Sequence, residues 1–364
     1  MSRFAHVPVR TLWFAAATTL ILAGCGDGND GGGAPFDAEG TSNDVNAVSA
    51  TFSSPAMASL GWAAGGIDGV FGAPFVSSSF GAIQDAAPST SLAASARRVL
   101  RSAIGFNART TTSVALAVLP AEVLGKTFEY NSGTAQYEAT ERTGAPANGV
   151  RFILYAINPV TEVPVEPLAE AGYADVLDES TATANALRLQ LVSGGTTYLS
   201  YGVTGSATAT GGTVVVDGFA TDGTTLVNFD LNNTFSDAAN GTLGVDYRLD
   251  VPSRDLDLVY LIDVTQVSTP AAVVNVDASV SGPHGDVSIE GSLAAAGGQL
   301  TANVNGAAFA VVTLDENSQV ASITKPDGSA LTAAEYGALA AIWGAVLKGI
   351  DAFEDLLDPI DNLL

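Results

Sequence analysis

The chain has 364 residues, of which 38 are acidic and 14 are basic, and its formal net charge is −24. Such an excess of negative charge argues against nucleic acid as a partner and against broad adhesion to anionic lipid, because both need a basic surface. Cys25 is the single cysteine, so no disulfide can form within the chain and the fold must be held by packing.

Residues 1–24 have the layout of a secretory signal peptide. Arg3 and Arg10 precede an apolar run over residues 12–22, which is too short to span a bilayer. Removing this segment takes away two arginines and no acid, so the net charge changes from −24 to −26. The pattern predicts an exported protein.

The signal ends in Leu22-Ala23-Gly24-Cys25, which resembles the lipobox of bacterial lipoproteins, and the resemblance covers residues 1–25 only. It implies cleavage between Gly24 and Cys25, lipidation of the Cys25 thiol and acylation of its new amino group. The mature protein would then be anchored to a membrane of the bacterial cell envelope. Gly26 follows the cysteine. In bacterial lipoproteins an aspartate at this position favours retention in the inner membrane, so the resemblance implies that the outer membrane is the more favoured location. An ordinary signal peptide with a chance cysteine is the alternative.

Residues 25–46 are expected to be the acylated cysteine and a flexible tether rich in Gly and Asp. The segment is too polar to order itself by burying apolar surface, and its root-mean-square span would be about 25 Å. The remainder, residues 47–364, is expected to form a single α+β body.

Residues 47–105 have helical periodicity. Ser54-Pro55 fits a helix start with proline at the first helical position, and a second helix is predicted over residues 91–104. The second helix carries a cluster of three basic residues: Arg97, Arg98 and Arg101. The cluster could bind an acidic headgroup or a carboxylate. The simpler interpretation is a surface patch that is balanced by the protein's own acids.

From residue 112 to 324 the period changes to two, which is the period of β-strands. Turn signals such as Asp222-Gly223 and Asn240-Gly241 separate the apolar-polar alternations. The predicted strands span residues 149–157, 186–192, 197–203, 213–219, 224–232, 243–251, 256–267, 272–280, 286–293, 299–304, 307–314 and 320–323. We expect one large curved antiparallel sheet, a meander of about ten or more strands with one covered face and one wet face.

The stretch from Gly144 to Pro167 is interrupted by prolines and is the least regular part of the body. It is expected to leave the sheet as a loop, and loops are where sites tend to lie. The polar residues in and after it are Glu162, Glu166, Glu170 and Tyr173.

The last predicted element is a helix over residues 331–358. Thr332 and Glu335 form a capping box at its start, and Pro359 ends it. Its broad apolar stripe should lie on the apolar face of the sheet. The expected fold is therefore α+β, with N-terminal helices and a C-terminal helix packed on one face of a large sheet. The acidic end of the chain is expected to be solvated.

Few residues in the sequence point to catalysis. His284 is the one histidine that remains after cleavage, and it is expected to be an exposed turn residue. The sequence has no G-x-S-x-G, H-E-x-x-H, C-x-x-C or P-loop motif, so we predict no catalytic residue, no metal site and no cofactor. For calcium, Asp217, Asp222 and Asp230 are too spread for one loop.

Carboxylates are abundant enough for an acid-pair hydrolase to be considered. The neighbouring pairs are Asp255/Asp257, Asp246/Asp250 and Asp175/Asp178. Residues two or four apart on a strand share a face, but solvent alone would select acids on a wet face in the same way.

Three hypotheses for function follow. The first is a non-enzymatic, membrane-tethered envelope protein that binds an apolar or lipid-like ligand between sheet and helices. Its architecture would be similar to that of the bacterial lipoprotein-carrier fold, although no motif of that family is present. The second is a structural or surface-interaction protein. The third is the acid-pair hydrolase.

Overall fold

The computed structural model describes residues 36–71 and 119–346, except for residues 183, 209, 237–240, 267–271 and 316–319. Its helices are α1 (Ala38–Phe52), α2 (Pro55–Phe71), the short 3-10 helix η1 (Pro252–Arg254) and a helix over residues 333–346, called the C-terminal helix below. Its strands are β1 (Thr127–Asn131), β2 (Gln136–Thr140), β3 (Gly149–Tyr155), β4 (Glu170–Asp178), β5 (Asn185–Ser193), β6 (Thr196–Thr208), β7 (Gly211–Thr221), β8 (Leu226–Ser236), β9 (Thr242–Val251), β10 (Leu256–Thr265), β11 (Val273–Ser281), β12 (Val287–Ala294), β13 (Gly297–Val304), β14 (Ala307–Leu314) and β15 (Val320–Thr324).

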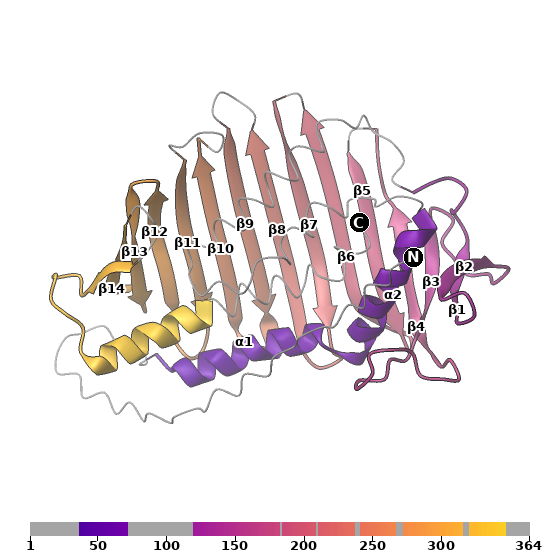
Figure 1. Ribbon diagram of the computed structural model, residues 1–364, viewed down its shortest axis with the longest axis horizontal. Coiled ribbons are helices and arrows are strands. Elements are labelled where there is room, and N and C mark those ends of the chain that lie inside the picture. The colour runs from indigo at the N-terminus through magenta and orange to yellow at the C-terminus, as the bar shows by residue number, and fades with distance from the viewer. Residues whose placement is uncertain are drawn as a thin grey trace, which may run out of the picture. The chain divides into compact units, whose positions relative to one another are not determined.

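The strands form one open sheet, and the α+β fold predicted from the sequence is confirmed (Figure 1). From β3 to β15 each strand is antiparallel to the next strand in the chain. At the other end β1 lies between β2 and β3, antiparallel to β2 and parallel to β3. The described sheet has 15 strands, so the expected meander is longer than its lower bound of about ten.

The alternation along each strand separates an apolar face from a polar face. In β9, Leu243, Val245 and Leu249 are buried, and the exposed Arg248 points to the opposite side. Residues directly opposite each other on neighbouring strands share a face, so the apolar side chains line up in rows across the sheet. One such row runs through Tyr201, Gly218, Phe229, Leu249, Leu258 and Val280.

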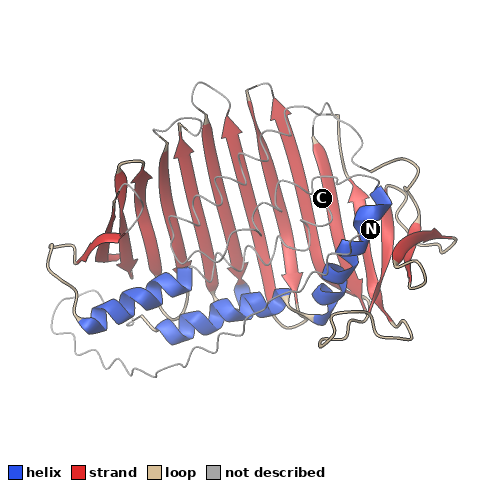
Figure 2. Cartoon of the chain, in the orientation of Figure 1, coloured by secondary structure: helices blue, strands red, loops and turns tan. Residues whose placement is uncertain are grey.

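The three longer helices pack on the apolar face of the sheet (Figures 1 and 2). α2 begins at Pro55, as predicted, and buries Met57 and Leu60. The predicted capping box also forms, because Thr332 N donates to Glu335 Oε2 at 2.7 Å and Glu335 N donates to Thr332 Oγ1 at 3.3 Å. The C-terminal helix buries a stripe that includes Leu339, Ile342 and Val346.

The tether predicted over residues 25–46 is wrong in its second half. Residues 38–46 form the first part of α1, so the body begins before residue 47. Asp37 caps this helix by accepting from the backbone N–H groups of Glu39 and Gly40, and Val45 and Val48 are fully buried. Apolar residues at this spacing hold the helix on the sheet even though its first turn is polar.

The irregular stretch predicted from Gly144 to Pro167 contains strand β3, so the connection that leaves the sheet spans only residues 156–169. Glu170 and Tyr173 belong to strand β4, and β1 and β2 also lie in a stretch for which we predicted no strand. These three strands have weak alternation, because their exposed and buried positions do not follow a strict period of two. The predicted helix over residues 91–104 and the end of the C-terminal helix after residue 346 lie outside the described residues.

Candidate functional site

The apolar face of the sheet is the largest feature on which a site could be built. At the α1 end of this face the rows are tightly packed, and Leu249 and Leu258 are buried almost completely. Three side chains that lie further from α1 are only partly buried. Val203 is two residues from Tyr201 on β6, Tyr247 is two residues from Leu249 on β9, and Ile262 is four residues from Leu258 on β10. Leu243, Val245 and Val264, on the same part of the strands, are buried, so partly buried positions lie there among buried ones.

The position of α1 is fixed by an ion pair at one end of β9. Arg254, in η1 directly after β9, places Nη1 at 2.7 Å from Asp44 Oδ1 on α1. Val245 lies six residues before the end of β9, which is about 20 Å away along the strand. The row through Val245 therefore lies on the part of the strands that is remote from α1, which crosses the other ends of the strands in Figure 1.

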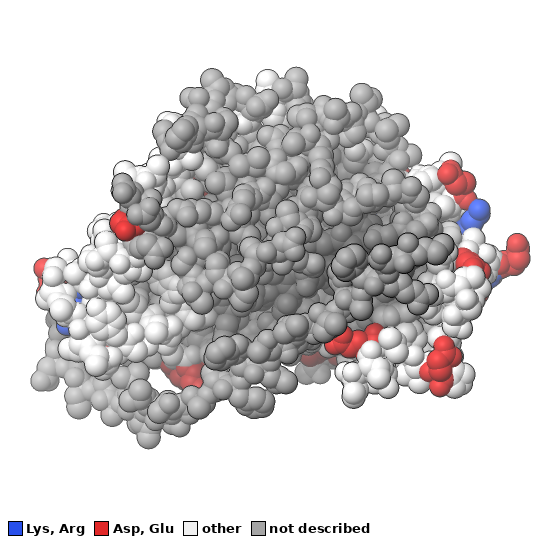
Figure 3. Space-filling model, in the orientation of Figure 1, with Lys and Arg blue, Asp and Glu red and all other residues white. Residues whose placement is uncertain are grey.

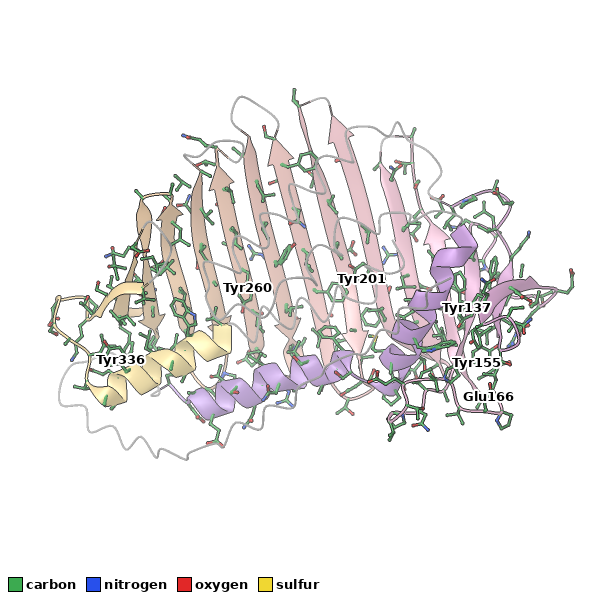
Figure 4. The ribbon with its side chains drawn as sticks, in the orientation of Figure 1. Tyr137, Tyr155, Glu166, Tyr201, Tyr260 and Tyr336 are labelled. Atoms are coloured by element: carbon green, nitrogen blue, oxygen red, sulfur yellow. The ribbon has the colours of Figure 1, made fainter. Side chains whose placement is uncertain are left out.

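Two asparagines, Asn185 and Asn233, interrupt one row of the apolar face. The row runs across the sheet through Asn185, Gly205, Val214, Asn233, Val245, Ile262 and Val276. Tyr247 lies next to this row and donates its hydroxyl hydrogen to Asn233 Oδ1 at 3.2 Å. We call Asn185, Val203, Gly205, Asn233, Tyr247 and Ile262 the Asn185 patch. Tyr201 and Tyr260, labelled in Figure 4, lie on the same face in rows nearer to α1.

Asn185 and Gly205 are the least expected members of the patch. Asn185 Oδ1 is buried and has no hydrogen-bond partner among the described residues. An unsatisfied buried acceptor of this kind costs about 1–3 kcal/mol. Directly opposite, a Cβ atom placed on Gly205 would have no heavy atom within 4 Å. An unpaired acceptor thus faces a position with room for additional atoms.

The polar face brings together acids from two of the predicted pairs. Asp257 of β10 lies directly opposite Asp250 of β9. The two acids that face each other therefore come from different predicted pairs. Partial burial, and then the charges of Asp250 and Asp255, raise the pKa of Asp257. Asp250 Oδ2 also accepts from Asn228 Nδ2 at 3.0 Å. Asp246, the other member of the second pair, is held instead by Arg248 at 2.8 Å.

A second cross-strand acid pair was not predicted. Asp277 of β11 faces Glu290 of β12, and burial followed by the charge of Glu290 raises the pKa of Asp277. Glu290 Oε1 accepts from Asn303 Nδ2 at 3.1 Å. The strand register creates both acid pairs, and no motif in the sequence marks them.

The third predicted pair, Asp175 and Asp178, has structural roles. Asp175 receives two hydrogen bonds from Arg151, at 2.7 and 2.6 Å, and the Arg151 guanidinium lies 3.6 Å from the centre of the Tyr173 ring. Asp178 accepts from the backbone N–H groups of Leu119 and Ser180. Both carboxylates therefore act as fixed acceptors of hydrogen bonds.

An ion-pair cluster lies at the end of the sheet that carries β1 to β4, where Figure 3 shows acidic and basic side chains together. Arg142 Nη1 is 2.9 Å from Glu129 Oε1 and 2.7 Å from Glu170 Oε1. The hydrogen bond from Arg142 lowers the pKa of Glu170, so this carboxylate stays ionised.

His284 does more than occupy an exposed turn. Its side chain is 38% exposed and lies between two carboxylates of the α1 region, with Nδ1 at 3.5 Å from Asp37 Oδ2 and Nε2 at 3.5 Å from Asp44 Oδ2. Its carbonyl oxygen accepts from Asp37 N at 2.8 Å. His284 therefore fastens the start of α1 to the β11–β12 turn, a long-range contact that the local sequence does not reveal.

The aspartates considered for calcium do not form a cation site in the described part of the chain. Asp217 and Asp230 lie opposite each other on β7 and β8, but Asp222 accepts from Thr224 N and Thr225 N in the turn between them. Among the described residues, no group of three or more His, Cys, Asp or Glu side chains is arranged to hold a metal ion.

Several predicted site residues lie outside the described residues. They are Gly24 and Cys25 of the lipobox, the basic cluster Arg97, Arg98 and Arg101, and the acidic end of the chain. Within the described residues, no helix has the length and apolar character needed to cross a membrane. Comparison of the chain with protein-family models, with curated proteins and with solved structures found no match.

Proposed function

We propose that this chain is a lipoprotein of the bacterial cell envelope, anchored through Cys25, and that its body binds an apolar ligand between the sheet and the helices. The lipobox-like ending of the signal supports the anchor. The apolar face supports the ligand, and the Asn185 patch is the part of that face where a ligand would lie.

The observation that carries the proposal is the extent of the apolar face. Fifteen strands make a sheet about 65 Å wide, and strands of this length are about 30 Å long. Each of the three described helices is about 22 Å long and 10 Å across. Together they cover about 700 Å² of a face of about 2,000 Å². The rest of the face extends beyond these described helices, and its apolar side chains, such as those of Leu243 and Val264, are buried.

The ligand is tested on a body that carries no anchor. The signal peptide is replaced, Cys25 is changed to Ser, and the purified protein is extracted with organic solvent for mass spectrometry. We expect a co-purifying lipid in a fixed ratio to the protein. If no lipid is extracted and no acyl-chain amphiphile binds the extracted protein in titration, the proposed ligand function is wrong.

The anchor is tested separately on the full chain. The wild type should fractionate with the outer membrane, and the mass of its N-terminal peptide should include a lipid on Cys25. The Cys25→Ser variant should appear in the soluble fraction. A wild-type chain whose Cys25 is unmodified would refute the anchor and leave the ligand proposal standing.

A surface-interaction role is the second candidate, and one loop favours it. The β3–β4 connection displays Val160 and Val163, which are 87% and 50% exposed. Backbone hydrogen bonds from Asn158 N to Val163 O and from Glu162 N to Asn158 O hold this loop in shape. If this role is correct, Val160→Ser with Val163→Ser reduces cross-linking to envelope proteins without changing the lipid content of the body.

A further inference from the structure

We infer that the ligand is a neutral amphiphile whose headgroup donates a hydrogen bond, and that Asn185 and Gly205 are the residues that receive it. The inference rests on the proposed ligand-binding function and specifies the chemical class of the ligand. Its evidence is the chemistry of the Asn185 patch.

The first step is the acceptor. Asn185 lies on the apolar side of β5, in line with Leu187 and Leu189, so its amide is directed to the face that the helices cover. Its Oδ1 atom is buried and has no partner among the described residues. A carbonyl oxygen can only accept, so the group that satisfies it must carry an N–H or O–H. A hydrogen bond made there is sheltered from water and hence strong.

The second step is the space next to the acceptor. Gly205 is the cross-strand neighbour of Asn185, and a Cβ at Gly205 would meet no heavy atom within 4 Å. On the neighbouring strand the glycine of the same face is crowded, because a Cβ on Gly218 would overlap the carbonyl oxygen of Ser200. The room at Gly205 is therefore a local property of the patch and is not shared by every glycine on this face.

The third step is the path for an apolar chain. From Asn185 the row continues across Val214 and Val245 to Ile262, and Val203 borders it on the α1 side. The distance from β5 to β10 is about 24 Å, enough for an extended acyl chain to lie along the row. The single polar group in the middle of this path, Asn233, already accepts from Tyr247. A ligand with one polar end and one apolar chain matches this arrangement.

The charge of the headgroup follows from the same atoms. A fatty-acid carboxylate offers only acceptor oxygens, so it cannot satisfy Asn185 Oδ1. The protein also carries a large net negative charge, which disfavours an anionic ligand. A hydroxyl headgroup, as in a monoacylglycerol, supplies the donor without the charge.

The test uses three probes with the same acyl chain, titrated into the anchor-free body: monolauroylglycerol, its dimethyl ether and laurate. We expect monolauroylglycerol to bind at least about tenfold more tightly than the other two, because a site with an unpaired acceptor discriminates against ligands that lack a donor. Equal binding of all three, or tighter binding of laurate, overturns the headgroup assignment.

Two variants locate the site. Asn185→Leu should abolish the preference for monolauroylglycerol while all three probes still bind. Gly205→Val should weaken all three probes by at least about tenfold, because its side chain fills the space beside Asn185. The matched controls are Asn232→Leu, whose unpaired Oδ1 lies on the polar face of β8, and Gly337→Ala, on the exposed side of the C-terminal helix. Neither control should change probe binding.

The outcomes separate the two proposals. If no probe binds and no lipid is extracted, the ligand function itself fails. If the probes bind but Asn185→Leu and Gly205→Val behave as the controls do, the ligand function stands and the site is elsewhere. Thermal unfolding of every variant confirms that each one is folded.

Discussion

Two glycines on the same face of adjacent strands should respond in opposite ways to the same substitution. Gly218 of β7 has φ = 155°, and a Cβ there would overlap the Ser200 carbonyl oxygen of β6. Gly205 of β6 has no heavy atom within 4 Å of the equivalent position. We therefore compare Gly218→Ala with Gly205→Ala.

The magnitudes follow from the backbone geometry. An alanine in the conformation of Gly218 costs about 1–3 kcal/mol in strain, and the overlap with a carbonyl oxygen that is part of the sheet ladder adds to this. We expect Gly218→Ala to destabilise the protein by about 3 kcal/mol. Gly205→Ala should be neutral or stabilising by up to about 1 kcal/mol, because alanine loses less backbone entropy on folding and gains no clash.

Urea unfolding and thermal unfolding, both followed by circular dichroism, measure the difference. For a chain of this size about 1 kcal/mol corresponds to about 2 °C, so the melting temperatures of the two variants should differ by at least 6 °C or so. If both variants are equally destabilised, Gly205 is as crowded as Gly218, and the space assigned to the Asn185 patch does not exist.

Three further substitutions test other features of the sheet. Asp257→Asn should stabilise the protein by about 0.5 kcal/mol at pH 7, since like charges directly opposite each other are unfavourable. Because burial and the charges of Asp250 and Asp255 raise the pKa of Asp257 in the folded state, the gain should be largest at neutral pH and disappear as the pH falls through that raised pKa and the carboxyl becomes protonated. A gain that persists at low pH would exclude charge as its cause. Arg254→Ala should lower the free energy of unfolding in urea by about 1–2 kcal/mol, because it leaves the buried Asp44 carboxylate without its cation. The loss is kept this small by the partial exposure of Arg254. A variant as stable as the wild type would show that this ion pair does not hold α1. Tyr260→Phe should cost about 1 kcal/mol, since it removes a buried hydrogen bond to the C-terminal helix, and an unchanged melting temperature would contradict that bond.

Features that depend on neighbouring residues in the chain could be predicted from the sequence. The start of α2 at Pro55, the capping box of Thr332 and Glu335, and the apolar face of β9 all follow from local spacing. α1 was missed because its polar first turn resembles a flexible segment, and its buried residues are explained only by the sheet below them. β1 and β2 were missed because they are short and lack strict alternation.

The candidate site could not be predicted, because it depends on register. Three hairpins separate Asn185 from Asn233. To predict that the two residues share a row, one must know the length of every turn between them and the register shift near Leu191. A change of one residue in any turn would move Asn233 to the other face. The opposition of Asp250 and Asp257 has the same origin. No local pattern carries that information.

The pairing of β3 to β15 in chain order also affects how the protein folds and whether its sheet can lose or gain strands. Each pairing joins segments that are close in the sequence, so the loop-closure entropy of each step is small and the relative contact order of the sheet is low. As in repeat proteins, much of the stability is then a sum of nearest-neighbour terms. A hairpin could be removed or added at the β15 end without changing any other pairing. At the β2 end it could not, because there β1 is inserted beside β3 in parallel.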